Sequence, residues 1–395
     1  MAALSGPGQW WSGICRHIRF ASAIRRDRSA GGLPISGGLI ERTVTRPLYM
    51  MSLRTQFDNL GDLTINAVLA ACISARAPLV CLTDGVPQGY LAEFDALASR
   101  LGASDIRYAS TLAGLYAAVG ALCRNGIALT LSPGDVGTGR GWMRRGTLAA
   151  LSRIAPQRSA TLQVGASMAD PAAGDARLFA LLLERSQPIT VRDPVSQATF
   201  ARMGVEVPVV PDLAFALPCA SANGGRDGLI ALRKVNSIPF DSLRIAVRAL
   251  ASQMREAGLE PKLYCQVAHD ANLHRRLAAE LDLRMINLVG GRPGFDDGMA
   301  VYANAGAIVS NRLHSLLLAA TAGATPYAFV GPAERKITAV FDQAGLNGQI
   351  IRLDEAARAG ARLAHRAALH RDSVAPAFER NARLLADFFD EAVGR

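Results

Sequence analysis

The sequence predicts an α/β protein with two Rossmann-like, doubly wound domains that face each other across a cleft. Short apolar runs alternate with helical patterns along most of the chain, which is typical of parallel sheets covered by helices. The length of 395 residues is typical of two domains of ordinary size. A stretch rich in proline and glycine interrupts the alternation at about residues 211–226 and marks the boundary between the two domains.

The first predicted domain covers residues 47–211 and follows a basic extension, residues 1–46. Its short apolar runs predict parallel strands that are buried on both faces. We expect these strands at residues 48–53, 79–82, 106–108, 127–131, 161–164 and 189–191. Helices are expected between the strands, one ending at about residue 75 and the others at residues 91–101, 112–123 and 176–184.

The second predicted domain covers residues 227–350 and follows a linker, residues 212–226. Its expected strands are residues 229–232, 262–267, 285–289, 307–310 and 327–330, the last of which is the final strand. We expect Asp241 to cap a helix that ends at Gly258, and a second helix over residues 270–281. The tail, residues 351–395, is expected to be helical and to cross back onto the first domain.

The net charge of +10 is uneven, since residues 1–47 contain seven arginines and only two acids. Large apolar residues recur in this extension at roughly helical spacing, namely Trp10, Trp11, Ile14 and Ile18. The extension is therefore either a basic helix lying on a membrane or a disordered tail, unless translation begins at Met50 or Met51. The last two alternatives are preferred to the membrane helix.

Composition excludes several other classes of protein. Beyond the extension the basic residues are spread thinly, whereas a nucleic-acid-binding surface would concentrate them. A basic protein that acts on anionic substrates near an anionic membrane fits this distribution. No apolar run reaches the roughly 18 residues that a membrane span needs. The six cysteines form no CxxC pair, which indicates a reducing compartment and no structural zinc or other metal site.

The most informative stretch runs from Ser310 through Asn311, Arg312, Leu313 and His314, because it joins a predicted strand to a predicted helix. Ligands of open α/β sheets bind at such carboxyl ends of strands. A helix N-terminus also favours anions, and an arginine and a histidine strengthen that preference for phosphate or carboxylate. The alternative is structural, with the arginine paired to a surface acid and the histidine capping the helix.

A second arginine occupies the equivalent place in the first domain. The strand at residues 189–191 is followed by Arg192, Asp193 and Pro194, where Asp193 is suited to cap a helix and Pro194 to begin it. Arg192 then projects from the carboxyl end of the first sheet. The alternative is that Arg192 pairs with Asp193 and only braces the loop.

Other polar residues follow strands in the same way. Asn59, Gly61 and Asp62 come after the first strand, where the glycine permits a close approach of the backbone. Asn59 and Asp62 hold sugar hydroxyls, or Asp62 simply caps the next helix, which is the simpler reading. Asp270 is a base, a hydroxyl ligand or an N-cap, and Lys336 adds a cation after the last strand. The glycine-rich loop 132–141 has neither the Walker A nor the GxGxxG spacing, and it is either a phosphate-binding loop or a flexible loop of the cleft.

Taken in order, these segments resemble the polysaccharide pyruvyl transferase family. The resemblance is carried by residues 59–62, 164–168, 191–193, Ser196, Gly204, 211–215, Asp270 and 310–314, and it spans about residues 53–345. Arg312, Leu313 and His314 are its sharpest part. The sequence departs from the family pattern at residues 132–135, where the family often has a glycine-rich triplet.

The resemblance implies a two-domain GT-B-like protein that transfers pyruvate from phosphoenolpyruvate to two hydroxyls of one sugar, which forms a ketal and releases phosphate. It implies that Arg312, His314, Leu313 and Arg192 take part in binding and turnover of phosphoenolpyruvate, the first domain serving the acceptor and the second the donor. No cofactor is expected. The expected acceptor is a saccharide of an exopolysaccharide or other cell-surface polymer, lipid-linked and reached at the cytoplasmic face of the plasma membrane.

Chemistry supports this implication, since two arginines suit a donor that carries both a phosphate and a carboxylate. His314 is the candidate general acid or base, and it and Arg312 are the candidate catalytic residues. The candidate substrate-binding residues are Arg192, Leu313, Asn311, Ser310, Lys336, Asn59, Gly61, Asp62 and Asp270. The alternatives are a GT-B glycosyltransferase that uses a nucleotide sugar and a catalytically silent relative that only binds glycan.

Overall fold

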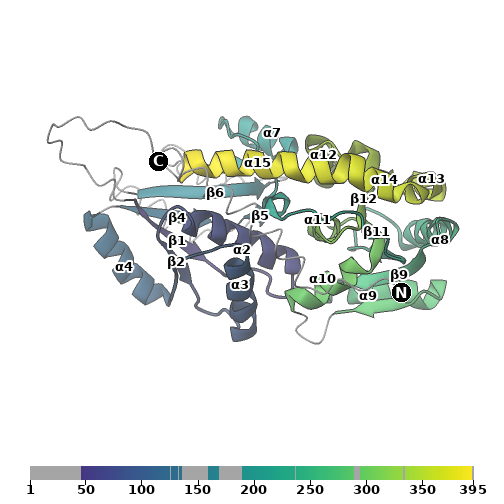
Figure 1. Ribbon diagram of the computed structural model, residues 1–395, viewed down its shortest axis with the longest axis horizontal. Coiled ribbons are helices and arrows are strands. Elements are labelled where there is room, and N and C mark those ends of the chain that lie inside the picture. The colour runs from purple at the N-terminus through teal and green to yellow at the C-terminus, as the bar shows by residue number, and fades with distance from the viewer. Residues whose placement is uncertain are drawn as a thin grey trace.

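The first sheet of the computed structural model contains seven parallel strands in the order β3-β2-β1-β4-β6-β5, with β7 paired to β6 (Figure 1). The structure describes residues 46–393 except 125, 132, 136–158, 169–188, 236, 289–293 and 332–333. Residues 1–45 of the expected extension, most of loop 132–141 and the expected helix 176–184 therefore lie outside the described residues. The strands are β1 (Leu48–Ser52), β2 (Leu79–Leu82), β3 (Ile106–Ala109), β4 (Ile127–Leu131), β5 (Gly134–Asp135), β6 (Ser159–Ser167) and β7 (Ile189–Val191).

Helices cover both faces of this sheet because alternate side chains of its strands point to opposite sides. Met51 and Cys81 belong to the large apolar core beneath α2 and α3, whereas Met50 and Val80 pack with Ala118 of α4 on the other face. The helices of this domain are α2 (Leu60–Ser74), α3 (Gln88–Arg100), α4 (Thr111–Arg124) and α7 (Pro194–Arg202).

The second sheet contains six parallel strands in the order β10-β9-β8-β11-β12-β13. Its strands are β8 (Asp227–Ala231), β9 (Glu260–Cys265), β10 (Met285–Asn287), β11 (Ala305–Ser310), β12 (Thr325–Val330) and β13 (Ile350–Arg352). The expectation that residues 327–330 form the final strand is wrong, because β13 follows and pairs with β12. This run of only three residues lacks the length that identifies a strand from sequence.

The helices of the second domain are α8 (Phe240–Glu256), α9 (Ala271–Leu281), α10 (Phe295–Ala303), α11 (Leu313–Thr321) and α12 (Arg335–Ala344). Asp241 does not cap α8, which begins one residue earlier with Pro239 at the N-cap, and Asp241 lies in the first turn. The short helical segments are η1 (Leu213–Ala216), η2 (Ala268–Asp270), η3 (Asn347–Gln349) and η4 (Leu353–Arg358).

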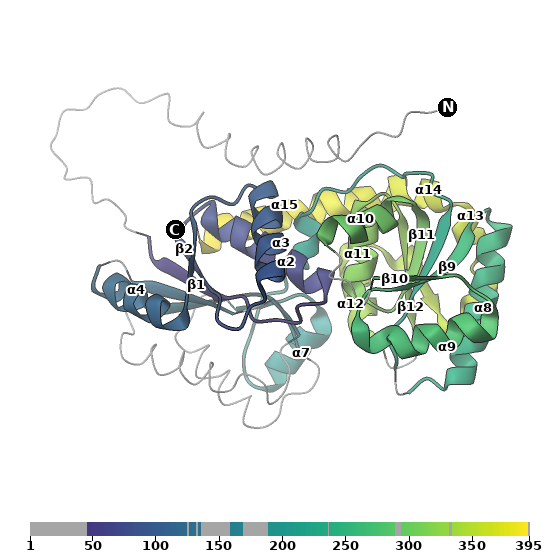
Figure 2. The ribbon, with the colours of Figure 1, turned by 90° about the horizontal axis from the view of Figure 1, so that it is seen from below.

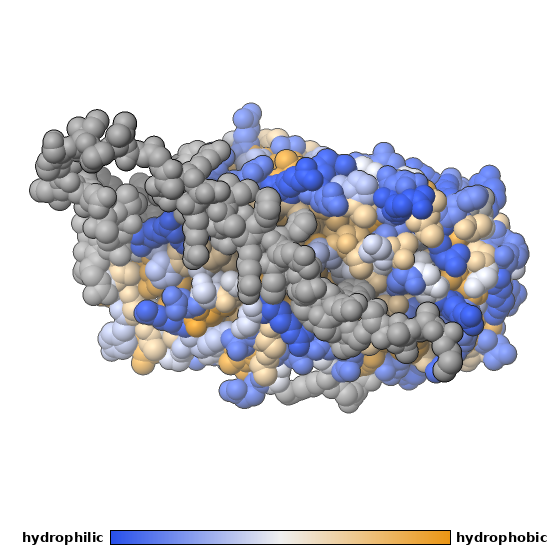
Figure 3. Space-filling view, in the orientation of Figure 1, coloured by the Kyte–Doolittle hydropathy of each residue, from blue (hydrophilic) through white to orange (hydrophobic). Residues whose placement is uncertain are grey.

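The C-terminal segments cross from the second domain back to the first. They are α13 (Gly360–Ala364), α14 (Arg366–Leu369), η5 (His370–Val374) and α15 (Ala375–Ala392). Helix α15 runs along both domains (Figure 1), with Arg380 Nη2 donating to the Ala344 carbonyl of α12 and Asp390 paired at 2.9 Å with Arg76, which follows the C-terminus of α2. Hydrophilic residues line this edge of the molecule in Figure 3, in keeping with the exposed Glu379, Arg383 and Asp387.

One continuous apolar core joins the domains. It contains Leu63 and Leu69 from α2 together with Leu316 from α11 and Phe341 from α12. Figures 1 and 2 both place α2 beside α11 between the two sheets. Because a large apolar interface resists relative motion of domains, this core holds the carboxyl ends of the two sheets in a defined orientation.

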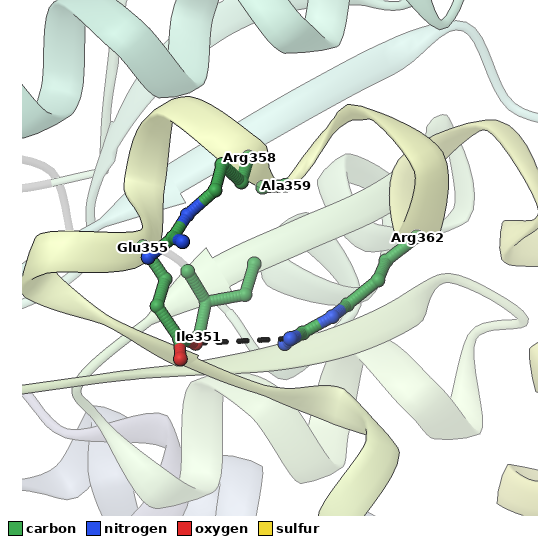
Figure 4. A pocket seen from close by; sticks show the side chains of 5 residues that line it. All are labelled: Ile351, Glu355, Arg358, Ala359 and Arg362. Atoms are coloured by element: carbon green, nitrogen blue, oxygen red, sulfur yellow. Dashed lines mark ion pairs between the residues drawn. The ribbon is translucent and has the colours of Figure 1, made fainter.

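A surface pocket lies on the side of the second sheet that faces away from the core shared by the two domains. It is lined by Ile351, Glu355, Arg358, Ala359 and Arg362 (Figure 4), with Glu355 and Arg362 paired at 3.7 Å. Ile351 and Ala359 belong to the core beneath α8, whereas α11 packs into the core between the domains. The pocket therefore shares no residue with the polar clusters described next.

Metal sites, cysteines and membrane-spanning helices were also considered in the sequence, and the described residues bear on all three. Among them, no group of histidines, cysteines and acids has the arrangement of a metal site. Cys72, Cys81, Cys219 and Cys265 are free thiols, and burial raises the pKa of Cys72 to about 11. No helix in the described ranges is long and apolar enough to cross a membrane.

Candidate functional site

The segment that joins β11 to α11 is fixed by two polar side chains that bind the neighbouring strand. Ser310 Oγ donates to the Ala231 carbonyl at 2.5 Å and accepts from the Arg312 N–H at 2.9 Å. The Asn311 amide accepts from the Arg233 N–H at 2.7 Å and donates to the Arg233 carbonyl at 3.1 Å. Both side chains are buried, so their contacts position the turn that presents the next residues.

Arg312 occupies the N-cap position of α11 and is held by a buried carboxylate. Its Nε lies 2.5 Å from Asp270 Oδ2, its Nη2 also contacts that oxygen, and Nη2 lies 2.8 Å from His269 Nε2. Asp270 is 3% exposed and Arg312 is 17% exposed. The structural alternative for Arg312 was a pairing with an acid on the surface. The acid that pairs with Arg312 is Asp270, which is buried. Asp270 sits at the N-cap of α9 but makes no side-chain capping bond there.

His314 lies in the first turn of α11 and meets residues of the first domain. Its Nε2 is 3.4 Å from Asp212 Oδ2 and 3.4 Å from Arg192 Nη1. Arg192 Nη1 donates to the same Asp212 oxygen at 2.8 Å. The side chain of His314 is 14% exposed, that of Asp212 is 2% exposed and that of Arg192 is 10% exposed. Two residues predicted from separate segments are therefore brought together, with an acid between them.

Electrostatics keep Asp212 ionised at neutral pH. Burial alone raises the pKa of this carboxyl, but the charges of His314 and Arg192 and their hydrogen bonds outweigh burial, so the pKa lies well below its usual range. Asp212 Oδ1 also accepts from the Ala214 N–H at 3.0 Å and caps η1. The carboxylate is thus a fixed negative charge between Arg192 and His314.

Asp193 has a separate, structural role. It caps α7 by accepting from the Ser196 N–H at 2.7 Å, and Pro194 is the first residue of that helix, as expected. The same carboxylate accepts from Ser167 Oγ at 3.2 Å. Arg192 forms its ion pair with Asp212, so the alternative in which it only braces the loop against Asp193 does not describe the structure.

Gly61 lies directly against His314. A Cβ built on Gly61 would be 2.4 Å from His314 Cβ and 2.5 Å from His314 Nδ1, distances that real carbon atoms do not reach. Asn59, which caps α2, holds this turn by accepting from the Gly61 N–H at 3.0 Å. The close backbone approach expected at Gly61 is therefore an approach to His314.

Asp62 does not cap α2, because Asn59 does. Its Oδ1 accepts from Asn59 Nδ2 at 3.0 Å and its Oδ2 accepts from Thr55 Oγ1 at 2.6 Å. Asp62 thus braces the loop before α2. Leu313 is the first residue of α11 and packs against the core between the domains. Lys336 is half-buried in the first turn of α12, after the carboxyl end of β12.

Substituting Gly61 with alanine is expected to displace His314 and to lower stability by about 1–3 kcal/mol, the usual range for overpacking. We expect a lower temperature of unfolding and a loss of whatever activity depends on His314. Gly348→Ala is the matched control, because a Cβ there meets nothing within 4 Å. Equal behaviour of the two variants would contradict the packing described for Gly61.

Sequence reasoning did not select two residues of this site, Asp212 and His269. Asp212 belongs to the 211–215 segment of the family resemblance but was assigned to the linker, and its partner His314 is 102 residues away. His269 precedes Asp270 directly and contacts Arg312. Its position after a strand was the available signal, since β9 ends at Cys265.

Several contacts close the domain interface around the two clusters. The loop before α2 reaches η2, with Asp58 Oδ2 accepting from the Ala268 N–H at 3.2 Å. Gln56 Nε2 lies 3.5 Å from His269 Nδ1. Farther out, Arg100 of α3 and Asp296 of α10 form two hydrogen bonds at 2.6 and 2.8 Å. The Arg312 cluster, with Asp270 and His269, and the Arg192 cluster, with Asp212 and His314, therefore both lie where the carboxyl ends of the two sheets meet.

Two parallel, helix-covered sheets that meet at their carboxyl ends define a two-domain Rossmann-like protein of the GT-B type, with cationic side chains from both domains at the interface. Within that class the chain belongs to the polysaccharide pyruvyl transferase family, whose model matches residues 104–329, more than half of the 395 residues. The match includes Arg192, Asp212, Arg312 and His314. The protein is accordingly a member of a transferase family that acts on saccharides.

Solved structures support the fold. A trehalose-6-phosphate synthase, OtsA, aligns with a TM-score of 0.52 at 10% identity over 88% of this chain and 100% of that chain. A putative UDP-N-acetylglucosamine 2-epimerase from Listeria monocytogenes aligns with a TM-score of 0.51 at 10% identity over 88% of this chain and 98% of that chain. At such identity the likeness shows the fold alone. A search of curated proteins found no match.

Proposed function

We propose that this protein transfers the pyruvyl group of phosphoenolpyruvate to two hydroxyls of a saccharide acceptor, as a ketal, and releases phosphate. The observation that carries the proposal is the contact of Arg192, from the first domain, with His314 beside Arg312 in the second. It gathers two guanidinium groups and a proton donor at one helix N-terminus. A small dianionic donor with a phosphate and a carboxylate suits such a set.

The arginines serve as the donor-binding groups in this proposal. Asp270 holds Arg312 through Nε and Nη2, and Asp212 holds Arg192 through Nη1, so both guanidinium groups are pre-oriented. Pre-oriented cations at a partly buried interface stabilise developing negative charge on the leaving phosphate without having to reorganise. The N-terminus of α11 adds a favourable field for the same anion.

His314 serves as the acid in this proposal. Protonated His314 gives a proton to the methylene carbon of phosphoenolpyruvate, and the double bond becomes an oxocarbenium-like centre at C2. A sugar hydroxyl attacks C2 and returns its proton to the imidazole. Phosphate then leaves with the C–O bonding pair, and the second hydroxyl attacks C2 and gives its proton to phosphate. Histidine suits both transfers because it exchanges protons near neutral pH. No cofactor enters this scheme.

The proposed acceptor is a sugar of a cell-surface or exopolysaccharide precursor, carried on a lipid at the cytoplasmic face of the membrane. The family to which the chain belongs supports a saccharide acceptor, and the positive net charge of +10 suits an anionic surface. A GT-B glycosyltransferase that uses a nucleotide sugar is the alternative, and the shared fold is compatible with it.

The proposal is tested by phosphate release from phosphoenolpyruvate, measured with and without a lipid-linked glycan fraction. We expect release that requires acceptor in the wild type and is lost in Arg192→Ala. Arg383→Ala is the matched control, because Arg383 is exposed on α15 and pairs only loosely with Glu379 at 3.8 Å. Binding of a nucleotide sugar, with no release of phosphate under any acceptor, would favour the glycosyltransferase instead.

A further inference from the structure

We propose that Asp212 is a positioning residue for His314, and that it holds Nε2 so that Nδ1 is the nitrogen that exchanges protons with the reactants. The assignment of Nδ1 as the reacting nitrogen rests on the proposed function. The orientation of the His314 ring is independent of the proposed function, because it follows from the contacts of the ring with Asp212, Gly61 and Arg192.

The Asp212 carboxylate is anchored on three sides. Oδ1 accepts from the Ala214 N–H at 3.0 Å, and Oδ2 accepts from Arg192 at 2.8 Å and faces His314 Nε2 at 3.4 Å. A group held by a main-chain amide and a guanidinium cannot rotate away from the imidazole. It is therefore suited to fix the orientation of the His314 ring.

The same contacts decide which His314 nitrogen carries the hydrogen in the neutral ring. Arg192 Nη1 also lies 3.4 Å from Nε2, but its contact with Asp212 is shorter, at 2.8 Å. Nη1 carries two hydrogens, and the shorter contact directs one of them to the carboxylate. Nε2 also faces this carboxylate oxygen, which only accepts hydrogen bonds. Because an ionised acceptor forms the stronger hydrogen bond, the proposal places a hydrogen on Nε2 that is donated to Asp212.

The other edge of the ring carries Nδ1, which makes no hydrogen bond among the described residues and is not a buried atom, unlike Nδ1 of His274 and His370. The Gly61 backbone packs against this side of the ring, and a Cβ there would sit 2.5 Å from Nδ1, so any other residue would cover this nitrogen. With Nε2 facing Asp212 and Nδ1 without a partner, the ring has one structural and one reactive edge. The Ser-His-Asp triad also gives one histidine nitrogen to a carboxylate and the other to the reaction, although there it is Nδ1 that faces the aspartate.

The other charged groups around His314 are engaged elsewhere. Arg192 is paired with Asp212 at 2.8 Å. Arg312, on the turn before α11, is paired with Asp270. Asp62 of α2 accepts from Thr55 and Asn59. Asp212 is therefore the acid in direct contact with the ring.

The orientation is tested by nitrogen NMR of the full chain with ¹⁵N-labelled histidine, the His314 signals being identified by their loss in His314→Gln. We expect neutral His314 to carry its hydrogen on Nε2. In Asp212→Asn this preference for Nε2 should weaken, because the charged acceptor that faces Nε2 is lost. A hydrogen on Nδ1 in the wild type would overturn the proposal, even if the variant failed to fold.

The role in turnover is tested by a double-mutant cycle on acceptor-dependent phosphate release. We expect Asp212→Asn to lower the rate at saturating donor and acceptor, with little further loss when Asp212→Asn is added to His314→Gln. Asp193→Asn is the matched control, since Asp193 is also a buried helix cap, and any loss it causes should add in full to that of His314→Gln. Additive losses for Asp212→Asn and His314→Gln would overturn the proposal, whereas a wild type without release would count against the proposed function and leave the NMR result to decide the orientation.

Discussion

His314→Gln is expected to reduce acceptor-dependent phosphate release by about 10²- to 10⁴-fold, the range that a positioned proton donor contributes. Glutamine keeps a side chain of similar reach but does not exchange protons near neutral pH. The fold should survive, because Asp212 remains paired with Arg192 at 2.8 Å and no buried charge is left alone. Initial rates with saturating donor and acceptor measure the effect.

The control for this prediction is His365→Gln, since His365 is exposed after α13 and makes no contact with the site described above. The control should retain wild-type rates. If His314→Gln kept more than a tenth of the wild-type rate, another group would have to supply the proton and the role given to His314 would be wrong.

Arg312→Ala is expected to abolish turnover and also to lower the free energy of unfolding by about 3–5 kcal/mol, the range for breaking a buried ion pair. The stability loss arises because Asp270, which is 3% exposed, would lose the guanidinium that binds it. The turnover loss arises because the donor would lose one of its two guanidinium groups. Denaturant unfolding and phosphate release measure the two effects separately.

A second substitution separates stability from catalysis at this position. Asp270→Asn removes the buried charge, so the double variant Arg312→Ala with Asp270→Asn should recover much of the lost stability without recovering turnover. Recovery of turnover in the double variant would mean that Arg312 acts only by neutralising Asp270. Arg312→Lys should be impaired as well, because an ammonium group does not reproduce the two-atom contact with Asp270.

Much of the fold could be predicted from local patterns. The strands at 79–82, 127–131 and 189–191 have the expected bounds, since each is an apolar run ended by residues that do not continue a strand. Strand β13 was missed because three residues are too few for a pattern. The N-cap of α8 is Pro239, whereas Asp241 was predicted two residues later, because a proline before a helix and an acid in its first turn both mark a helix start.

The candidate site could be predicted only in part. Arg192, Arg312 and His314 each follow a strand, and that position is visible in the sequence. The acids that hold them are distant along the chain, with Asp270 separated from Arg312 by 42 residues and Asp212 from Arg192 by 20. Such pairings depend on how the two sheets are placed by their shared core, which no local pattern specifies. The same holds for Ser310 and Asn311, which bind main-chain groups 79 and 78 residues away, at Ala231 and Arg233.

The most direct test of the account is the transfer of label from phosphoenolpyruvate carrying ¹³C at C2 to a lipid-linked glycan. We predict one labelled ketal carbon on the glycan for each phosphate released, and neither product with Arg312→Ala. Phosphate release without label on the glycan would mean that the protein hydrolyses the donor. Absence of both products with every acceptor, together with binding of a nucleotide sugar, would contradict the account.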